Sequence, residues 1–299
     1  MGAQNFIRLT EAKDLIFKKV LGLCGLIVIG LVLGIFLTLL SKAALSMEHT
    51  GLAFLYQTVW DPVREHFGAL PFFVGTMITS ILALSISIPF SFALAIFLGE
   101  YVKDGPWSSV FNTALDLLAG IPSIIYGFWG LFVLVPIVRS FESAMGVLPH
   151  GVGIFSSAIV LAVMIIPYSA SISREVISLV PEDIKEAALS LGATPFECIT
   201  KVIFPYAKSG IFAGVLMSFG RAISETMAVT MLIGNSNKIP TSIFSPANTL
   251  ASIIANEFAE ASEELYLSSL VELALVLFFV TAAFSLIGRI IIKKWVLDK

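Results

Sequence analysis

Charged residues are scarce in this sequence. Only 13% of its 299 residues are Asp, Glu, Lys or Arg, whereas 57% are hydrophobic and the mean hydropathy is +0.95. Soluble globular domains carry about 25% charged residues, so this composition excludes that class and indicates a membrane protein. The net charge of −3 is small and gives no reason to expect nucleic acid as a partner.

Cysteine and histidine are also rare. Cys24 lies in an apolar run and Cys198 in a polar connection, so no disulfide between them is expected. The three histidines lack the spacing of a metal site, and none is predicted. The sequence contains neither the phosphate-binding loop G-x-x-x-x-G-K-[ST] nor the nucleophile motif G-x-S-x-G. We therefore predict a chain that is not an enzyme, with no catalytic residues and no bound cofactor.

Long apolar runs in the sequence agree with a membrane protein. A membrane-spanning helix needs about 20 such residues, and six runs qualify: 20–41, 71–99, about 109–138, 151–173, 209–234 and 265–288. The sequence therefore predicts an all-α membrane protein with six transmembrane helices. Because Asp116 and Glu272 are charged, the sequence does not fix where the third and sixth spans begin and end. The first run is too long for a signal peptide and is expected to remain as an anchor.

Basic residues give the predicted orientation. If the N-terminus is cytoplasmic, only Lys42, Arg64, Arg139 and Lys238 fall in the connections on the outer side, and most other basic residues lie inside. This bias predicts a multi-pass protein with both termini in the cytoplasm. The predicted parts are a cytoplasmic segment 1–19, a membrane domain 20–292 and a cytoplasmic tail 293–299. Residues 1–19 suit either a helix lying on the inner membrane surface or a frayed tail.

The connection at 174–208 has the signals of two short helices. In "VPEDIKEAALSLGATPFECITKVIFP", Pro181 suits a first helical position and Gly192 suits a left-handed helix end. Thr194 and Glu197 have the spacing of a capping box at the start of the second helix. We therefore predict a structured element on the cytoplasmic side.

One face of the first of these helices is apolar and small. Ile184, Ala187, Ala188 and Leu191 recur at spacings of three and four. Such a face suits the docking of a partner protein. It equally suits packing against the ends of the chain's own spans, and the pattern alone slightly favours that second interpretation.

The fifth run contains two charged residues, Arg221 and Glu225, in "SFGRAISETMAVTMLIGN". Counting from residue 209 puts Arg221 near the middle of the bilayer. Residues four apart share a helix face, so the two can either form an ion pair that locks the helix bundle or line a path for an anion. For phosphate, the guanidinium offers a fork of donors, and Glu225 can accept a hydrogen bond from a protonated phosphate oxygen.

The sequence allows other interpretations of these features. "GIPSIIYGFWG" at 120–130 fits either a broken helix that lines a path or close packing of small residues. A membrane-embedded enzyme could use Glu225 as an acid or base, but no second reactive group accompanies it. A secondary transporter commonly shows internal repeats, and no convincing repeat is present.

The 174–208 connection resembles the EAA loop of permease subunits of ABC importers. The matching residues are Glu186, Ala187, Ala188, Gly192 and Pro205, with Val202 and Phe204 where that family more often has Ile and Leu. The resemblance implies that these five residues couple the chain to an ATPase. ATP and Mg would then bind to that partner and not to this chain.

Three stretches, 119–136, 168–194 and 220–235, are similar to permeases of phosphate-specific ABC importers, and the sequence at 225–231 is typical of the C-type subunit. The likeness covers roughly residues 71–292. It implies a bacterial inner-membrane phosphate importer with an A-type permease paralogue, two ATPase copies and an extracytoplasmic phosphate-binding protein as partners. Sulfate, molybdate or another oxyanion stays open as cargo.

Overall fold

The computed structural model describes the backbone of residues 2–297 and the side chains of residues 14–294. Within this range the chain is helical apart from its connections and one isolated bridge between Asp61 and His66. The α-helices are α1 (Gly2–Thr50), α2 (Leu70–Ile96), α3 (Pro106–Gly120), α4 (Ser123–Trp129), α5 (Val135–Ala144), α6 (Ile154–Ser178), α7 (Glu182–Ser190), α8 (Pro195–Cys198), α9 (Phe204–Ser224), α10 (Met227–Leu232), α11 (Leu250–Glu257) and α12 (Glu264–Leu297). Short 3-10 helices are η1 (Gly51–Leu55) and η2 (Pro62–Arg64), and π-helical segments are η3 (Phe97–Tyr101), η4 (Gly130–Leu134) and η5 (Ile199–Ile203).

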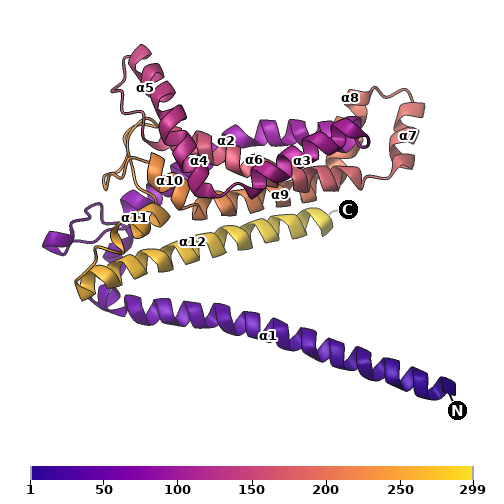
Figure 1. Cartoon of the computed structure of the whole chain (residues 1–299), viewed down its shortest axis with the longest axis horizontal. Coiled ribbons are helices and arrows are strands. Elements are labelled where there is room, and N and C mark those ends of the chain that lie inside the picture. Colours follow the sequence, from indigo (N-terminus) through magenta and orange to yellow (C-terminus); the bar gives the residue numbers. More distant parts are fainter. Residues whose placement is uncertain (1, 298–299) are drawn as a thin grey trace.

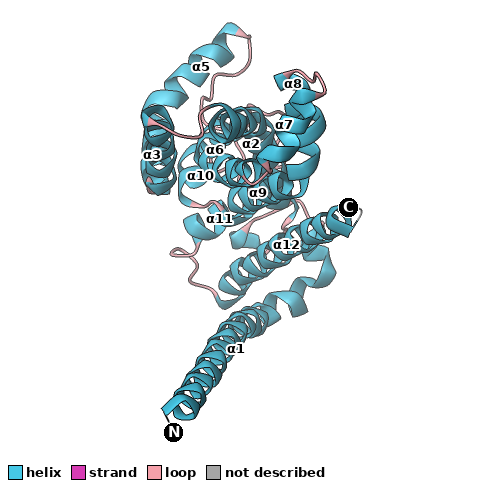
Figure 2. Cartoon of the chain, turned by 90° about the vertical axis from the view of Figure 1, so that its right-hand side faces the viewer, coloured by secondary structure: helices cyan, strands magenta, loops and turns pink. Residues whose placement is uncertain are grey.

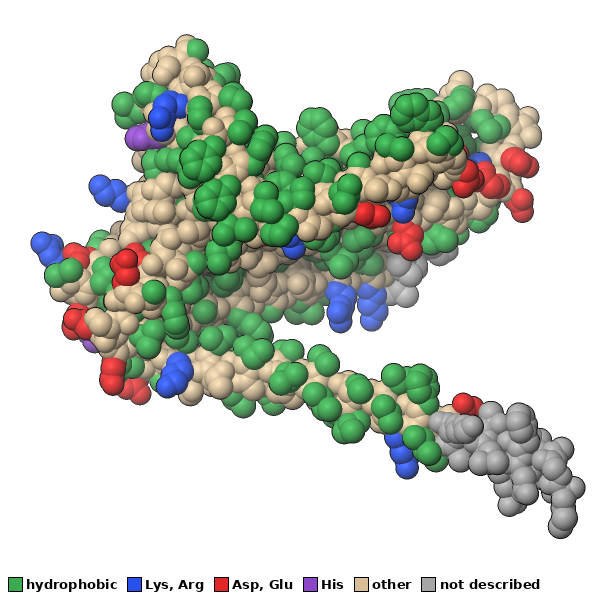
Figure 3. Space-filling model, viewed as in Figure 1, with side chains coloured by type: hydrophobic (Ala, Val, Ile, Leu, Met, Phe, Trp, Pro, Cys, Tyr) green, Lys and Arg blue, Asp and Glu red, His purple; other side chains and the backbone are tan. Residues whose placement is uncertain are grey.

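Six helical segments in the described part are long and apolar enough to cross a membrane, which confirms the predicted number. They are Asp14–Leu55, Leu70–Tyr101, Ser123–Ala144, Ile154–Ser178, Pro195–Ser224 and Glu264–Lys294. Most charged side chains on the visible face lie toward the two ends of the molecule, with hydrophobic side chains between them (Figure 3). The chain is a multi-pass membrane protein.

Helix α6 is the centre of the bundle. It packs against α2 and α9, and its apolar side chains form one buried cluster with Ala83 of α2 and Ala222 of α9. Figures 1 and 2 show α1 and α12 outside this group, with α7 and α8 at the end where α12 finishes. We call this end the α7 end and the opposite one the α11 end. Most described side chains of α1 are exposed and apolar, as expected for a helix that faces lipid.

Helix α1 is joined to α12 by serine side chains near the α11 end. The backbone N–H of Ser46 donates to Ser268 Oγ at 3.0 Å, and the hydroxyls of Ser46 and Ser269 are also 3.0 Å apart. Glu272 lies buried in the same continuous helix, so the sixth span includes it. Helix α1 passes through residue 19 and α12 through residue 292 without a break.

Two predicted spans were wrong in their limits. The third, expected at about 109–138, is broken after Gly120, because Ile121 and Pro122 are extended and a separate helix begins at Ser123. This confirms the broken-helix interpretation of 120–130. The fifth, expected at 209–234, ends at Ser224 and begins as early as Pro195. Most of residues 1–19, expected to form either a surface helix or a frayed tail, lie outside the residues whose side chains are described.

A carboxylate holds the α11 end together. Glu257 Oε2 accepts hydrogen bonds from Trp60 Nε1 at 2.7 Å and from the Tyr266 hydroxyl at 2.6 Å, and its Oε1 accepts one from Asn237 at 3.2 Å. The donors come from three different segments. One charged acceptor therefore fixes the connection before α2, the connection after α10 and the start of α12.

We predict that Glu257→Gln lowers the free energy of unfolding by about 2 kcal/mol, because hydrogen bonds to a charged group contribute about 1.5–3 kcal/mol. Denaturant unfolding in detergent, followed by tryptophan fluorescence, measures the change. Glu260→Gln is the control, since Glu260 is exposed. An equal loss in both variants would contradict this role for Glu257.

Candidate functional site

The first candidate site lies where two broken helices meet α6. Helix α9 ends at Ser224, because Glu225 is extended with φ −69° and ψ 126°, and the chain resumes as α10 at Met227. Ser224 Oγ donates to the carbonyls of Gly220 and Arg221 at 3.0 and 3.3 Å. A helix end inside a membrane needs such partners.

At the second break, two tyrosine hydroxyls donate hydrogen bonds to carbonyls at the helix end. Helix α3 ends at Gly120, and its last carbonyls accept hydrogen bonds from two hydroxyls: Tyr126 to Leu118 at 2.9 Å and Tyr168 to Ala119 at 3.3 Å. Helices α4 and α10, which follow the two breaks, pack on each other. A Cβ on Gly127 would meet the Ala228 Cα at 3.2 Å, so the small residue is needed there. Both interpretations of 120–130, the break and the close packing, therefore hold.

Arg221 lies in the last turn of α9 and faces α6. Its guanidinium carbon is 4.5 Å from the centre of the Tyr168 ring, a distance typical of a cation–π contact. The buried Nε has no hydrogen-bond partner among the described residues, and neither does the buried hydroxyl of Ser218, three residues earlier on α9. Two unpartnered polar groups therefore lie on one face of the helix.

The ion pair between Arg221 and Glu225, one of the two alternatives that the sequence left open, is absent from the described residues. The pairing needs a helix that continues through residue 225, but the backbone turns extended there. Glu225 is 9% exposed, and no described residue forms a hydrogen bond or ion pair with its carboxylate. Each charge is therefore free to meet something other than its neighbour.

The second candidate site is the segment α7–α8 at the α7 end. Its start and turn follow the sequence closely: Gly192 has φ +90°, and Thr194 and Glu197 form both hydrogen bonds of the capping box. Pro181 precedes the first helical residue rather than occupying it. Helix α8 continues through η5 into α9, so Pro205 lies within this long helical run and not on α7.

The predicted apolar face of α7 is divided. Ala188 packs against a buried cluster formed by the ends of α2, α6 and α9, but Ile184, Ala187 and Leu191 are exposed, Leu191 by 90%. Glu186 and Gly192 are exposed too, and so is Phe196 at the start of α8, by 73%. Most of the face is therefore free to bind a partner.

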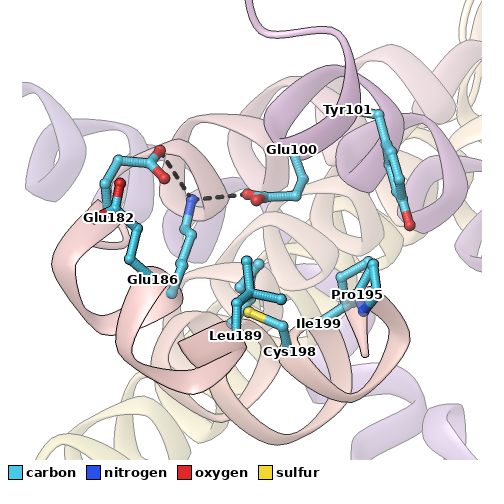
Figure 4. Close-up of a pocket in the computed structure, with 10 residues that line it drawn as sticks. Glu100, Tyr101, Glu182, Glu186, Leu189, Pro195, Cys198 and Ile199 are labelled. Carbon is cyan, nitrogen blue, oxygen red and sulfur yellow. Dashed lines mark hydrogen bonds and ion pairs between the residues drawn. The ribbon is translucent and has the colours of Figure 1, made fainter. Parts of the chain in front are cut away.

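Lys185, which sequence reasoning missed, is the buried residue of α7. Its Nζ is 2.7 Å from Glu100 Oε2 in η3 and 3.4 Å from Glu182 Oε1 (Figure 4). Lys103 pairs with Glu182 and lies 3.6 Å from Glu100. We call these four residues the charged network. The hydrogen bond from Lys103 lowers the pKa of Glu182. For Lys103, burial lowers the pKa, but the bonds to Glu182 and the nearby charges outweigh it and raise the pKa.

Six spanning helices, two of them bounded at one end by extended backbone, define a multi-pass membrane protein with the permease fold of ABC transporters. The chain belongs to the family of binding-protein-dependent transport system inner membrane components, whose model matches residues 91–296. It is 42% identical over 295 residues to the phosphate transport system permease protein PstC of Haemophilus influenzae, covering 93% of each chain. It is 40% identical to the protein of that name from Mesorhizobium japonicum, covering 96% of this chain and 92% of the relative.

Solved structures support the fold. A structure of the inward-facing MetNI methionine ABC transporter matches 79% of this chain and 99% of its own, with a TM-score of 0.56 and 16% identity. A crystal structure of an amino acid ABC transporter with histidines matches 75% of this chain and 92% of its own, with a TM-score of 0.51 and 17% identity.

We predict that the effects of Arg221→Gln and Glu225→Gln on the free energy of unfolding add to within about 0.5 kcal/mol, as for residues that do not pair. The single and double variants are unfolded in detergent. Lys185→Gln with Glu100→Gln is the positive control, because that pair is in contact. A coupling energy above about 1 kcal/mol between Arg221 and Glu225 would show that the two side chains pair.

Proposed function

We propose that this chain is a permease subunit of an ABC importer that moves inorganic phosphate into the bacterial cytoplasm, driven by ATP hydrolysis on partner subunits. The proposal rests on the sequence identity of 40–42%, over nearly the whole chain, between this protein and relatives named as phosphate transport system permeases. The partners are an A-type permease paralogue, an ATPase dimer and an extracytoplasmic phosphate-binding protein. The chain has no ATPase motif, so ATP and Mg belong to the partner.

The α7 end is the cytoplasmic end in this proposal. Basic residues gather in the connections at this end, as the positive-inside rule expects. The N-terminal half of α1 and the C-terminal half of α12 point to the same end as α7 (Figure 1), which agrees with six crossings. The α11 end then faces the binding protein.

The Arg221 site supplies the chemistry of the proposed path. Arg221 is half-buried in the last turn of a membrane span, where a charge is costly unless it is partnered, and the Tyr168 ring offsets only part of that cost. The unpartnered Nε leaves donors for an oxyanion. Glu225 can accept a hydrogen bond from a protonated phosphate oxygen, which sulfate lacks near neutral pH. Extended backbone at this depth is tolerated where it lines a polar cavity, and this supports a path between the two breaks.

The exposed face of α7 and the start of α8 form the proposed ATPase contact. Glu186, Ala187 and Ala188 stand on α7, and Gly192 sets the angle between α7 and α8. Pro205 lies in the first turn of α9, in the same helical run as α8, and so does not belong to the exposed face itself. The exposed apolar side chains there have no other cover within the described chain.

The direct test is ATP-driven phosphate uptake into vesicles that contain this chain, the paralogue, the ATPase and the binding protein. Arg221→Gln is expected to abolish uptake with assembly intact, because the neutral amide removes the charge and the donor fork. Tyr168→Phe keeps the ring and is expected to retain most uptake. Normal uptake by Arg221→Gln would remove Arg221 from the path. Equal competition by sulfate in the unsubstituted complex would change the proposed cargo.

Gly192→Val is expected to weaken ATPase binding about 10-fold or more, because a branched residue at φ +90° carries a backbone strain of about 1–3 kcal/mol. A Cβ at this position would meet no atom within 4 Å, so strain and not collision is the cause. Gly192→Asn is the matched control, since Asn tolerates positive φ. Co-purification of the ATPase measures the effect. Unchanged binding in the Val variant would show that the turn does not position the contact.

A further inference from the structure

The charged network is the polar link between α7 and the end of α2. In Figure 4, Glu182 on α7 and Glu100 on η3 both point to the ammonium group of Lys185, with bonds drawn to each. Lys103 closes the group by contacting both glutamates. Two acids and two bases from two separate segments therefore neutralise one another.

Burial distinguishes this link from an ordinary surface ion pair. The Lys185 side chain is 3% exposed and that of Glu100 is 21% exposed. A buried ammonium is costly without its partner, so breaking such a pair is strongly unfavourable. The Lys201–Glu197 pair, at 2.8 Å, has side chains that are 71% and 40% exposed, and both residues lie in one continuous helical run, so this pair does not connect separate segments.

The two ends of the link lie on elements with different neighbours. Helix α7 packs mainly on α8 and η5. Glu100 belongs to the π-helical segment that continues α2, and α2 packs along both α6 and α9. A small pocket of about 170 Å³ lies between α7, η5 and η3, lined by Glu100, Lys185, Leu189 and Cys198 among others. The long lysine side chain reaches past this gap, which apolar contacts do not fill.

We propose that Lys185 and Glu100 are positioning residues that carry the displacement of α7 into α2, and so couple ATP hydrolysis on the partner to the opening of the path. This inference rests on the proposed function. Ala188 also attaches α7 to the bundle, but an alanine contact can slide, whereas a buried ion pair between two elements holds its length.

The test uses the complete transporter in vesicles, with ATP hydrolysis and phosphate uptake measured separately. Lys185→Gln and Glu100→Gln are expected to assemble and hydrolyse ATP, while phosphate moved per ATP falls 10-fold or more. The reversed pair, Lys185→Glu with Glu100→Lys, is expected to move at least a third as much phosphate per ATP as the unsubstituted transporter. Lys201→Gln is the control and leaves it unchanged. An unchanged ratio in both Gln variants would overturn the proposal, as would equal loss of assembly and uptake without rescue by the reversed pair.

A second readout does not depend on the cargo. Spin labels at Ser190→Cys on α7 and Ser85→Cys on α2 report the distance across the link, with Cys24 and Cys198 replaced by serine. With the link intact, this distance is expected to be the same before and after ATP addition, because the two helices move together. In Lys185→Gln it is expected to shift with ATP. A shift in the unsubstituted link would overturn the proposal even if the transporter carried another anion, whereas no phosphate uptake with a constant distance would overturn only the cargo.

Discussion

A lipid bilayer offers no hydrogen bonds to a polypeptide backbone, and the site of this protein follows from that constraint. In the described part, the chain leaves the helical conformation just before the span Ser123–Ala144, at Ile121–Pro122, and just after the span Pro195–Ser224, at Glu225. At each break, hydroxyl groups replace the missing partners of the helix-end carbonyls: Tyr126 and Tyr168 at the first, Ser224 at the second. Because the helices that follow the breaks pack on each other, the irregular backbone and the polar side chains collect in one place.

Lys185, which is buried, and Arg221, which is half-buried, show opposite solutions to the energetic cost of removing a cation from water. Lys185 is neutralised by carboxylates from two elements, and such a group resists separation. Arg221 has an aromatic ring as its partner and keeps an unpartnered Nε, so its solvation is incomplete within the described chain. A fully paired charge suits a mechanical link, whereas an incompletely paired one suits a ligand that comes and goes.

Much of the fold could be predicted from the sequence, because apolar runs, capping residues and glycine act locally. Gly192 and the Thr194–Glu197 capping box were found from a few adjacent letters. The break at Glu225 was missed because Ser224 and Thr226 are also acceptable inside a membrane helix, and only the packing of α10 on α4 decides between the two states. The contacts of Arg221 with Tyr168 and of Lys185 with Glu100 join distant segments, and no local pattern encodes them. A lysine beside an otherwise small-residue face was the one signal that pointed to Lys185.

The segment α7–α8 has two connections to the centre of the bundle. Helix α8 passes through η5 into α9, so the capped start at Thr194 and the cation Arg221 belong to one helical run. Helix α7 reaches α2 through the charged network, and that connection also contains a π-helical segment, η3. Single π-helical turns are frequent at functional sites. Both α2 and α9 pack on α6, and α6 supplies the ring that covers Arg221. On the proposed function, a partner that changes the angle between α7 and α8 therefore moves α2 and α9 relative to α6, and this alters what faces the guanidinium.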